Sequence, residues 1–272
     1  MLSDNELFDQ LLRTGVPSCA PSFALPAIER RWSGQGTPPL KPPTRSFELF
    51  DDVLPEAEEH FIQRRSRSAF RGWQAKFPSK RMQRTMMARS HLELRLLEIC
   101  EVDARVERFV EQPLCVFYVD GDGRLRRYVP DLFLDSMGER KLVEVKWERD
   151  AREPKNEARW PWIAQAINGL GFTFEVLTER HILNQPRADN VIKLLRYRRA
   201  DPLDDRHRNA LIEALTYGPL SMADVRSIWP DLPPASLYRA LTDGWLWTDL
   251  SREIEETSPL HLAASPRRAP CS

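Results

Sequence analysis

The chain has 272 residues, of which 42% are hydrophobic, and this suits a globular protein of one or two domains. The 40 basic and 40 acidic residues balance, so overall charge offers no attraction to nucleic acid, and any such contact needs local clustering. The four cysteines form no Cys-x-x-Cys pair, and neither a signal-peptide pattern nor a run of roughly 18 apolar residues occurs, so we expect a cytoplasmic protein without a zinc site or a membrane partner.

The N-terminal part divides into two segments of different composition. Residues 1–45 are rich in proline and predict an arm or linker with one short helix over residues 5–13. Residues 61–90 hold nine Arg or Lys residues and no acidic residue, with Phe70, Trp73 and Phe77 interleaved. This pattern is typical of a phosphate-contacting surface, although a solvated charged face would look the same. The predicted DNA-binding residues are Arg64, Arg65, Arg67, Arg71, Lys76, Lys80, Arg81 and Arg84.

The middle of the chain alternates between helical and strand patterns. Apolar spacing predicts a helix over residues 90–100 with Ser90 as its N-cap. Three apolar runs between residues 114 and 147, separated by Asp-Gly-Asp-Gly and Ser-Met-Gly, predict a three-stranded meander. A helix over residues 159–171 and a strand over residues 172–179 follow. This order of elements indicates an α/β core.

The C-terminal part predicts a separate unit. Residues 206–215, 221–229 and 234–244 have the spacing of three short helices, and residues 245–263 that of a hairpin, which is the order of a winged helix. We therefore expect an arm over residues 1–45, an α/β domain over 46–200 that includes the basic segment, and a winged-helix-like α+β domain over 201–272.

Three charged residues stand within the predicted strands of "YVPDLFLDSMGERKLVEVKW" (128–147). Alternation puts Glu144 and Lys146 on one face of their strand, and a turn centred near Gly138 would place Asp131 approximately opposite Val145 and Lys146. Two carboxylates brought together in this way persist only if Lys146, a metal ion or both neutralise them, and oxygen ligands suit Mg²⁺. A cross-strand ion pair on a solvated edge is the alternative.

These residues also carry a resemblance to a known family. Pro130 and Asp131 followed by Glu144, Val145 and Lys146 resemble the PD-(D/E)xK motif of restriction-endonuclease-like nucleases. More specifically, "FPSKRMQRTMMARSHLE", "VERFVEQPLCVFYVDGDGRLRRYVPDLFL", "KLVEVK" and "GFTFEVLTERHIL", in this order, resemble the TnsA endonuclease subunit of Tn-seven-like transposons over residues 60–200. Some members of that family carry glutamine at the position of Glu144.

The resemblance implies a restriction-endonuclease-like core, in which a mixed sheet is flanked by helices, and an enzyme that cleaves the 5′ ends of a transposon. It places Glu93, Asp131, Glu144 and Lys146 on the catalytic positions, with Asp131, Glu144 and Glu93 binding Mg²⁺, for which Mn²⁺ is a substitute. The implied partners are DNA, a TnsB-like transposase and a TnsC-like AAA+ ATPase. The implied setting is bacterial, with association with the nucleoid during activity.

Other interpretations stay open at this point. Glu93 follows Ser90 by three residues, so the two also form the pattern of a capping box. Gln112 lies near the site by the resemblance but is equally a hydrogen-bonding residue at a strand end. A stand-alone restriction-type or junction-resolving nuclease would use the same core, and a winged-helix DNA-binding protein with an inactive α/β domain is the alternative outside enzymes.

Overall fold

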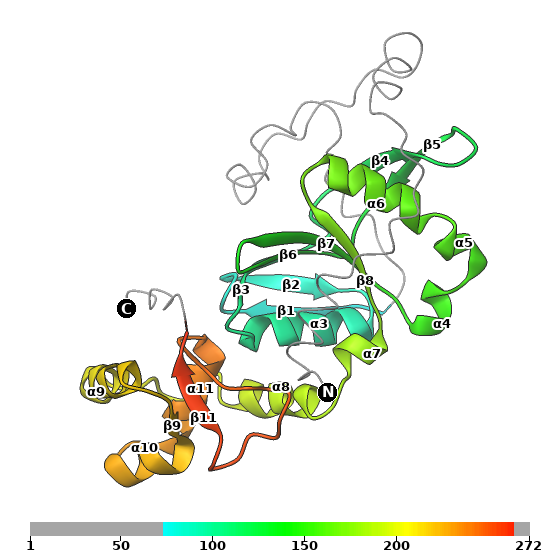
Figure 1. Ribbon diagram of the computed structural model, residues 1–272. Helices are drawn as coiled ribbons and strands as arrows, with labels where there is room; N and C mark the ends of the chain where they lie inside the picture. The colour runs from blue at the N-terminus through cyan, green and yellow to red at the C-terminus, as the bar shows by residue number, and fades with distance from the viewer. Residues whose placement is uncertain (1–72, 264–272) are drawn as a thin grey trace.

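The computed structural model describes residues 73–263, which form the mixed α/β fold that the sequence predicts (Figure 1). Its central sheet has four strands in the order β3-β6-β7-β8. The β3–β6 and β6–β7 pairs are antiparallel, whereas β7 and β8 are parallel. The strands are β3 (Val106–Glu111), β6 (Leu132–Ser136), β7 (Glu139–Val145) and β8 (Thr173–Leu177). Within residues 73–263, no helix is long and apolar enough to cross a membrane.

A two-residue turn joins β6 and β7. Ser136 pairs with Glu139, and the turn residues Met137 and Gly138 have φ angles of 52° and 81°. Two positive φ angles define a type I′ turn, whose twist matches that of the flanking strands. The turn is thus centred between Met137 and Gly138. The register therefore places Asp131 opposite Glu144, one position before Val145 and two before Lys146, the two partners that the sequence predicts.

Helices cover both faces of the sheet. Helix α3 (His91–Val102) lies on the face that carries Leu132 and Val143, and helix α6 (Trp160–Gly169) covers the other face, where Phe133 and Phe174 pack (Figure 1). Ser90 Oγ accepts a hydrogen bond from the Glu93 amide at 3.1 Å, so the predicted N-cap is confirmed. The chain reaches α6 from β7 through the short helices α4 (Glu148–Ala151) and α5 (Pro154–Glu157).

The predicted three-stranded meander is wrong. Strands β4 (Val116–Val119) and β5 (Leu125–Tyr128) form a separate hairpin that packs on α6, and β3 takes the place beside β6. Pro113 and Pro130 lie at the two junctions, and proline cannot donate the backbone hydrogen bond that would continue a ladder. A further hairpin, β1 (Ala75–Ser79) and β2 (Arg84–Ala88), lies within the basic segment, where the sequence predicts no strand.

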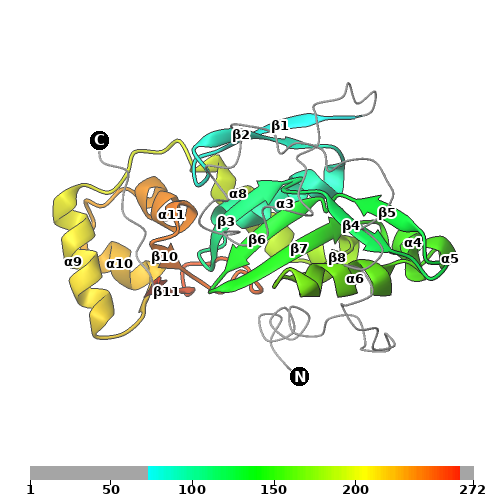
Figure 2. The same ribbon diagram turned by 90° about the horizontal axis from the view of Figure 1, so that it is seen from above.

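The C-terminal elements form a small α+β unit. Its predicted helices and hairpin are confirmed, and β9 joins the hairpin to give a sheet of order β10-β11-β9. Its strands and helices are β9 (Leu220–Ser221), β10 (Leu246–Trp247), β11 (Pro259–Leu262), α9 (Asp205–Thr216), α10 (Met222–Ile228) and α11 (Pro234–Asp243). The helices α7 (Glu179–Ile182) and α8 (Arg187–Arg196) lead into it from β8. This unit and the β4–β5 hairpin lie at opposite ends of the molecule (Figures 1 and 2).

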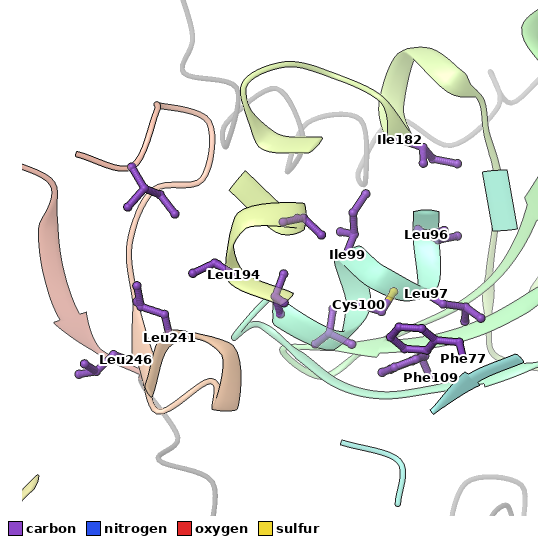
Figure 3. Close-up of a cluster of buried hydrophobic side chains, with 14 of the residues drawn as sticks. Phe77, Leu96, Leu97, Ile99, Cys100, Phe109, Ile182, Leu194, Leu241 and Leu246 are labelled. Atoms are coloured by element: carbon purple, nitrogen blue, oxygen red, sulfur yellow. The ribbon is translucent and has the colours of Figure 1, made fainter. Parts of the chain in front are cut away.

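One continuous cluster of buried apolar side chains joins the C-terminal unit to the α/β part. Ile99 of α3, Leu194 of α8 and Leu241 of α11 belong to this cluster, which Figure 3 shows in part. The domain boundary that we expect near residue 200 therefore does not separate two independent hydrophobic cores.

Candidate active site

The four predicted catalytic residues gather at one end of the central sheet. Strand β6 begins just after Asp131, and the antiparallel strand β7 ends between Glu144 and Lys146. Glu93, in the first turn of α3, lines a small pocket together with Asp131 and Val145. The antiparallel hairpin thus supplies three of the side chains, and α3 adds the fourth from the face that it covers.

Backbone hydrogen bonds fix Asp131 on both sides. Its Oδ2 accepts a hydrogen bond from the Val145 amide at 2.8 Å, and its own amide donates to the Val143 carbonyl at 3.0 Å. The Gln112 amide donates to the Asp131 carbonyl at 2.9 Å, and Gln112 has a φ of 45°, which ends β3 at this point. Gln112 therefore lies beside the site, and it contacts Asp131 through its backbone.

Glu144 is buried, and both of its oxygens have partners. Lys146 Nζ contacts Oε1 at 2.6 Å, and the hydroxyl of Tyr128 donates to Oε2. Burial and the negative charge of Glu144 raise the pKa of Tyr128 well above its ordinary value, so the phenol remains a donor. Sequence reasoning missed Tyr128, which reads as an ordinary strand aromatic until β5 is seen to end beside Glu144.

Glu93 both accepts a hydrogen bond from the backbone near the start of α3 and lines the pocket of the candidate site. Its Oε2 accepts a hydrogen bond from the Arg89 amide at 2.8 Å, whereas the reciprocal bond of a capping box would come from the Ser90 amide. Only half of the predicted capping box is therefore present. The carboxylate of Glu93 lies in the same pocket as Asp131, and this pocket has an apolar wall that includes Leu96 and Leu97.

Negative charge exceeds positive charge among these four residues. Burial, followed by the charges of Glu144 and Glu93, raises the pKa of Asp131 well above its ordinary value. Burial likewise raises the pKa of Glu93. Burial opposes the charge on Lys146, but the Glu144 and Asp131 carboxylates outweigh it and raise the pKa of Lys146, so its side chain is an ammonium. Three carboxylates around one ammonium is an arrangement that an additional cation would stabilise.

The donor set accommodates a hard cation only in part. No group of three or more His, Cys, Asp or Glu side chains within residues 73–263 has an arrangement that would hold a metal ion. Both carboxylate oxygens of Glu144 already contact Lys146 or Tyr128, whereas Asp131 Oδ1 accepts no hydrogen bond from the described residues. Asp131 and Glu93 therefore fit a divalent cation as two carboxylates facing one pocket, and Glu144 would have to release Lys146 or Tyr128 to join them.

The predicted phosphate-contacting residues separate into different environments. Arg64, Arg65, Arg67 and Arg71 lie outside the described residues. Arg84 forms an ion pair with Glu111, and Arg81 donates to the carbonyls of Asp103 and Val106. Lys80 donates to the Arg198 carbonyl, whereas Lys76 is exposed on β1.

These contacts correct the interpretation of the basic segment. Protein oxygens already occupy the cationic groups of Lys80, Arg81 and Arg84, so a phosphate would have to compete for them. Phe77 is 4% exposed and belongs to the core, so it is no surface anchor, whereas Trp73 is exposed and contacts His91. Among the described candidates, Lys76 and Lys80 keep the predicted surface position, and Lys80 already donates to the Arg198 carbonyl.

Comparison with protein-family models and with curated proteins gives no match for this chain.

Proposed function

We propose that this chain is a metal-dependent DNA endonuclease of the TnsA type, which cleaves the 5′ ends of a Tn-seven-like transposon. The observation that carries the proposal is the convergence of Glu93, Asp131, Glu144 and Lys146 at one end of the sheet. The order α3, β3, β6, β7, α6, β8 also supports a restriction-endonuclease-like core. In such a core, a strand-turn-strand unit presents the acidic and basic residues to one phosphodiester.

The residue roles follow from their contacts. Asp131 and Glu93 would hold Mg²⁺, or Mn²⁺ in its place, and a bound divalent cation polarises a phosphodiester and acidifies its bound water. Glu144 holds Lys146 through the 2.6 Å ion pair, and the Tyr128 hydroxyl fixes the other oxygen of Glu144. Lys146 is therefore oriented to donate to a phosphate oxygen or to the attacking water, and it stabilises the negative charge that develops in the transition state.

The C-terminal unit has features of a docking module in this proposal. We assign it a winged-helix-like fold that binds a TnsC-like AAA+ ATPase or a TnsB-like transposase. Arg239 is the only basic residue of α11, and it is held by Asp243 at 2.6 Å and by the Ala200 carbonyl at 2.8 Å. A helix that reads a DNA major groove needs available basic side chains. Protein docking therefore suits α11 better than sequence reading.

The proposal is tested by end cleavage with the purified chain, its transposase and ATPase partners and transposon-end DNA. Asp131→Asn keeps an acceptor for the Val145 amide but removes the charge, and Lys146→Met removes the ammonium. We expect each to reduce 5′-end cleavage by at least about 100-fold, since transition-state charge stabilisation is lost. Asp189→Asn, an exposed carboxylate on α8, is the control and should cleave normally. Wild-type cleavage by Asp131→Asn would refute the proposal.

Two alternatives predict different results in the same assay. A stand-alone restriction-type or junction-resolving nuclease would cleave without the partners. The full occupation of the Glu144 oxygens by Lys146 and Tyr128 favours a second candidate, a DNA-binding protein with an inactive α/β domain. In that case the wild-type chain would contribute no 5′-end cleavage in this assay, and Asp131→Asn would leave transposition unchanged.

A further inference from the structure

Arg159 is connected to the candidate active site through a chain of ring contacts. Its guanidinium carbon lies 4.5 Å from the ring centroid of Trp160. The Trp160 ring lies 5.9 Å from that of Phe174, and Phe174 meets Tyr128 edge-on at 5.9 Å. Tyr128 in turn donates its hydroxyl to Glu144. Arg159 is therefore on the Glu144 side of the sheet, at the start of α6.

The indole beneath the guanidinium is itself fixed. Trp160 is 6% exposed, and its Nε1 donates to the Ala151 carbonyl at 3.2 Å. A guanidinium over an indole face gains a cation–π interaction, which restricts its orientation without using its N–H donors. The charge of Arg159 is also felt at the site, because it opposes the upward pKa shifts of both Lys146 and Tyr128.

Arg159 has no anionic partner among the described residues, a feature that it shares with Arg198 and Arg208, which are also partly buried and also lie over aromatic rings. Within residues 73–263 it forms no ion pair, and its buried Nε has no hydrogen-bond partner. By contrast, Arg84 pairs with Glu111, Arg187 with Asp103 at 3.3 Å, and Arg239 with Asp243 at 2.6 Å. A partly buried guanidinium without a partner is costly, and an anionic ligand would offset that cost.

We propose that Arg159 is a phosphate-binding residue of this site, whose guanidinium donates to the non-bridging oxygens of a DNA backbone phosphate next to Lys146. The planar fork of arginine matches two phosphate oxygens, and the ring of Trp160 holds it in one orientation. The inference rests on the proposed function for the identity of the phosphate as part of DNA. It adds a residue that neither the motif nor the family resemblance indicates.

The experiment measures binding of the full chain to a labelled DNA duplex at several salt concentrations in EDTA, so that cleavage plays no part. Arg159→Gln and Arg159→Met remove the charge, and Met keeps apolar contact with Trp160. We expect about tenfold weaker binding and a salt slope reduced by about one phosphate. Arg152→Gln is the matched control, because Arg152 is exposed and already pairs with Glu148 at 2.6 Å, and it should bind like the wild type.

Wild-type affinity and salt slope in a neutral Arg159 variant that keeps the wild-type unfolding midpoint would overturn the inference. An equal loss in Arg152→Gln would also overturn it, because the effect would then be one of general charge. The result for the phosphate site can be distinguished from the result for the proposed function. If Asp131→Asn still cleaves but Arg159→Gln loses affinity, the assignment of the active site to Asp131 fails and the phosphate site stands. The reverse pair of results rejects only the phosphate site.

Discussion

The carboxylate of Asp131 lies where two other negative charges, on Glu93 and Glu144, act on it. Because its pKa is raised, the folded chain holds this proton more tightly than the unfolded chain does. At acidic pH Asp131 is protonated in both states and does not lower the free energy of unfolding. As the pH rises from the ordinary carboxyl range through the pKa of the folded state, Asp131 lowers the free energy of unfolding by a growing amount. The candidate catalytic carboxylate thus lies in an electrostatic environment that opposes its ionisation.

We accordingly predict that Asp131→Asn stabilises the metal-free chain at neutral and alkaline pH, on the order of 1 kcal/mol. The amide oxygen can still accept the bond from the Val145 amide, so the backbone contact survives. Urea unfolding in EDTA between about pH 4 and pH 8 measures the effect, and the gain should increase with pH. A gain that is independent of pH, or a loss at about pH 8, would contradict the electrostatic explanation.

Strands β7 and β8 carry a second buried charge pair. Lys141 Nζ lies 3.1 Å from Glu175 Oε1, and the two side chains are 1% and 5% exposed. Burial raises the pKa of Glu175 to about 7, although Lys141 opposes the shift. Glu139 also contacts Lys141 at 3.1 Å from the exposed end of β7. The pair stands on parallel neighbouring strands and joins them beyond their backbone hydrogen bonds.

Removing one partner of this pair should lower the free energy of unfolding far more than removing both partners. Lys141→Met leaves Glu175 buried without its cation, and we expect a loss of about 3 kcal/mol at about pH 8. The loss should be smaller at about pH 6, where Glu175 takes up a proton. Lys141→Met combined with Glu175→Leu should recover most of the stability, as measured by urea unfolding. A double variant as unstable as Lys141→Met alone would show that Lys141 acts through other contacts.

The elements that the sequence predicts well carry their own local signals. Helix α3 has both a helical apolar spacing and the Ser90 cap, and the β6–β7 hairpin has a turn that fixes its register. Strand β3 was missed because Val106, Phe109 and Val110 have a helix-like spacing, and the strand is bulged between Val106 and Arg108. Its state depends on pairing with β6, which is a tertiary contact that local spacing does not encode.

The same distinction separates the site residues. Asp131, Glu144 and Lys146 belong to one strand-turn-strand unit, so alternation and the turn already place them near one another. Tyr128 and Arg159 sit in contexts that are common for their residue types, a strand end and a helix start. Only the packing of the β4–β5 hairpin and of α6 around Phe174 brings them towards Glu144.

At the scale of the whole molecule, helices α3 and α8 connect the candidate site to the C-terminal unit. Helix α3 carries Glu93 at its first turn and contacts both α8 and α11. The side chain of Thr242 in α11 donates to the Leu194 carbonyl at 3.0 Å, and Lys193 donates to the Ile254 carbonyl at 2.8 Å. A partner docked on the C-terminal unit would therefore be held in a fixed position relative to Glu93.

Asn190 makes several hydrogen bonds across this connection. It is 3% exposed, and its amide nitrogen donates to the carbonyls of Leu250 and Arg252 at 2.9 and 2.6 Å. Its Oδ1 accepts a hydrogen bond from the Ile254 amide at 3.2 Å. One side chain of α8 thus satisfies three backbone groups of the segment that leads into β11.

Because one core spans both parts, we predict a single cooperative unfolding transition for the described region, with tryptophan fluorescence and circular dichroism changing together. Asn190→Ala leaves the three backbone groups without this partner and should cost about 2–3 kcal/mol. Asp189→Ala, on the exposed side of the same helix, should stay within about 0.5 kcal/mol of the wild type. Should the C-terminal unit instead melt separately in the wild type, the two parts would be independent domains, and a docked partner could not be held rigidly relative to Glu93 through α8.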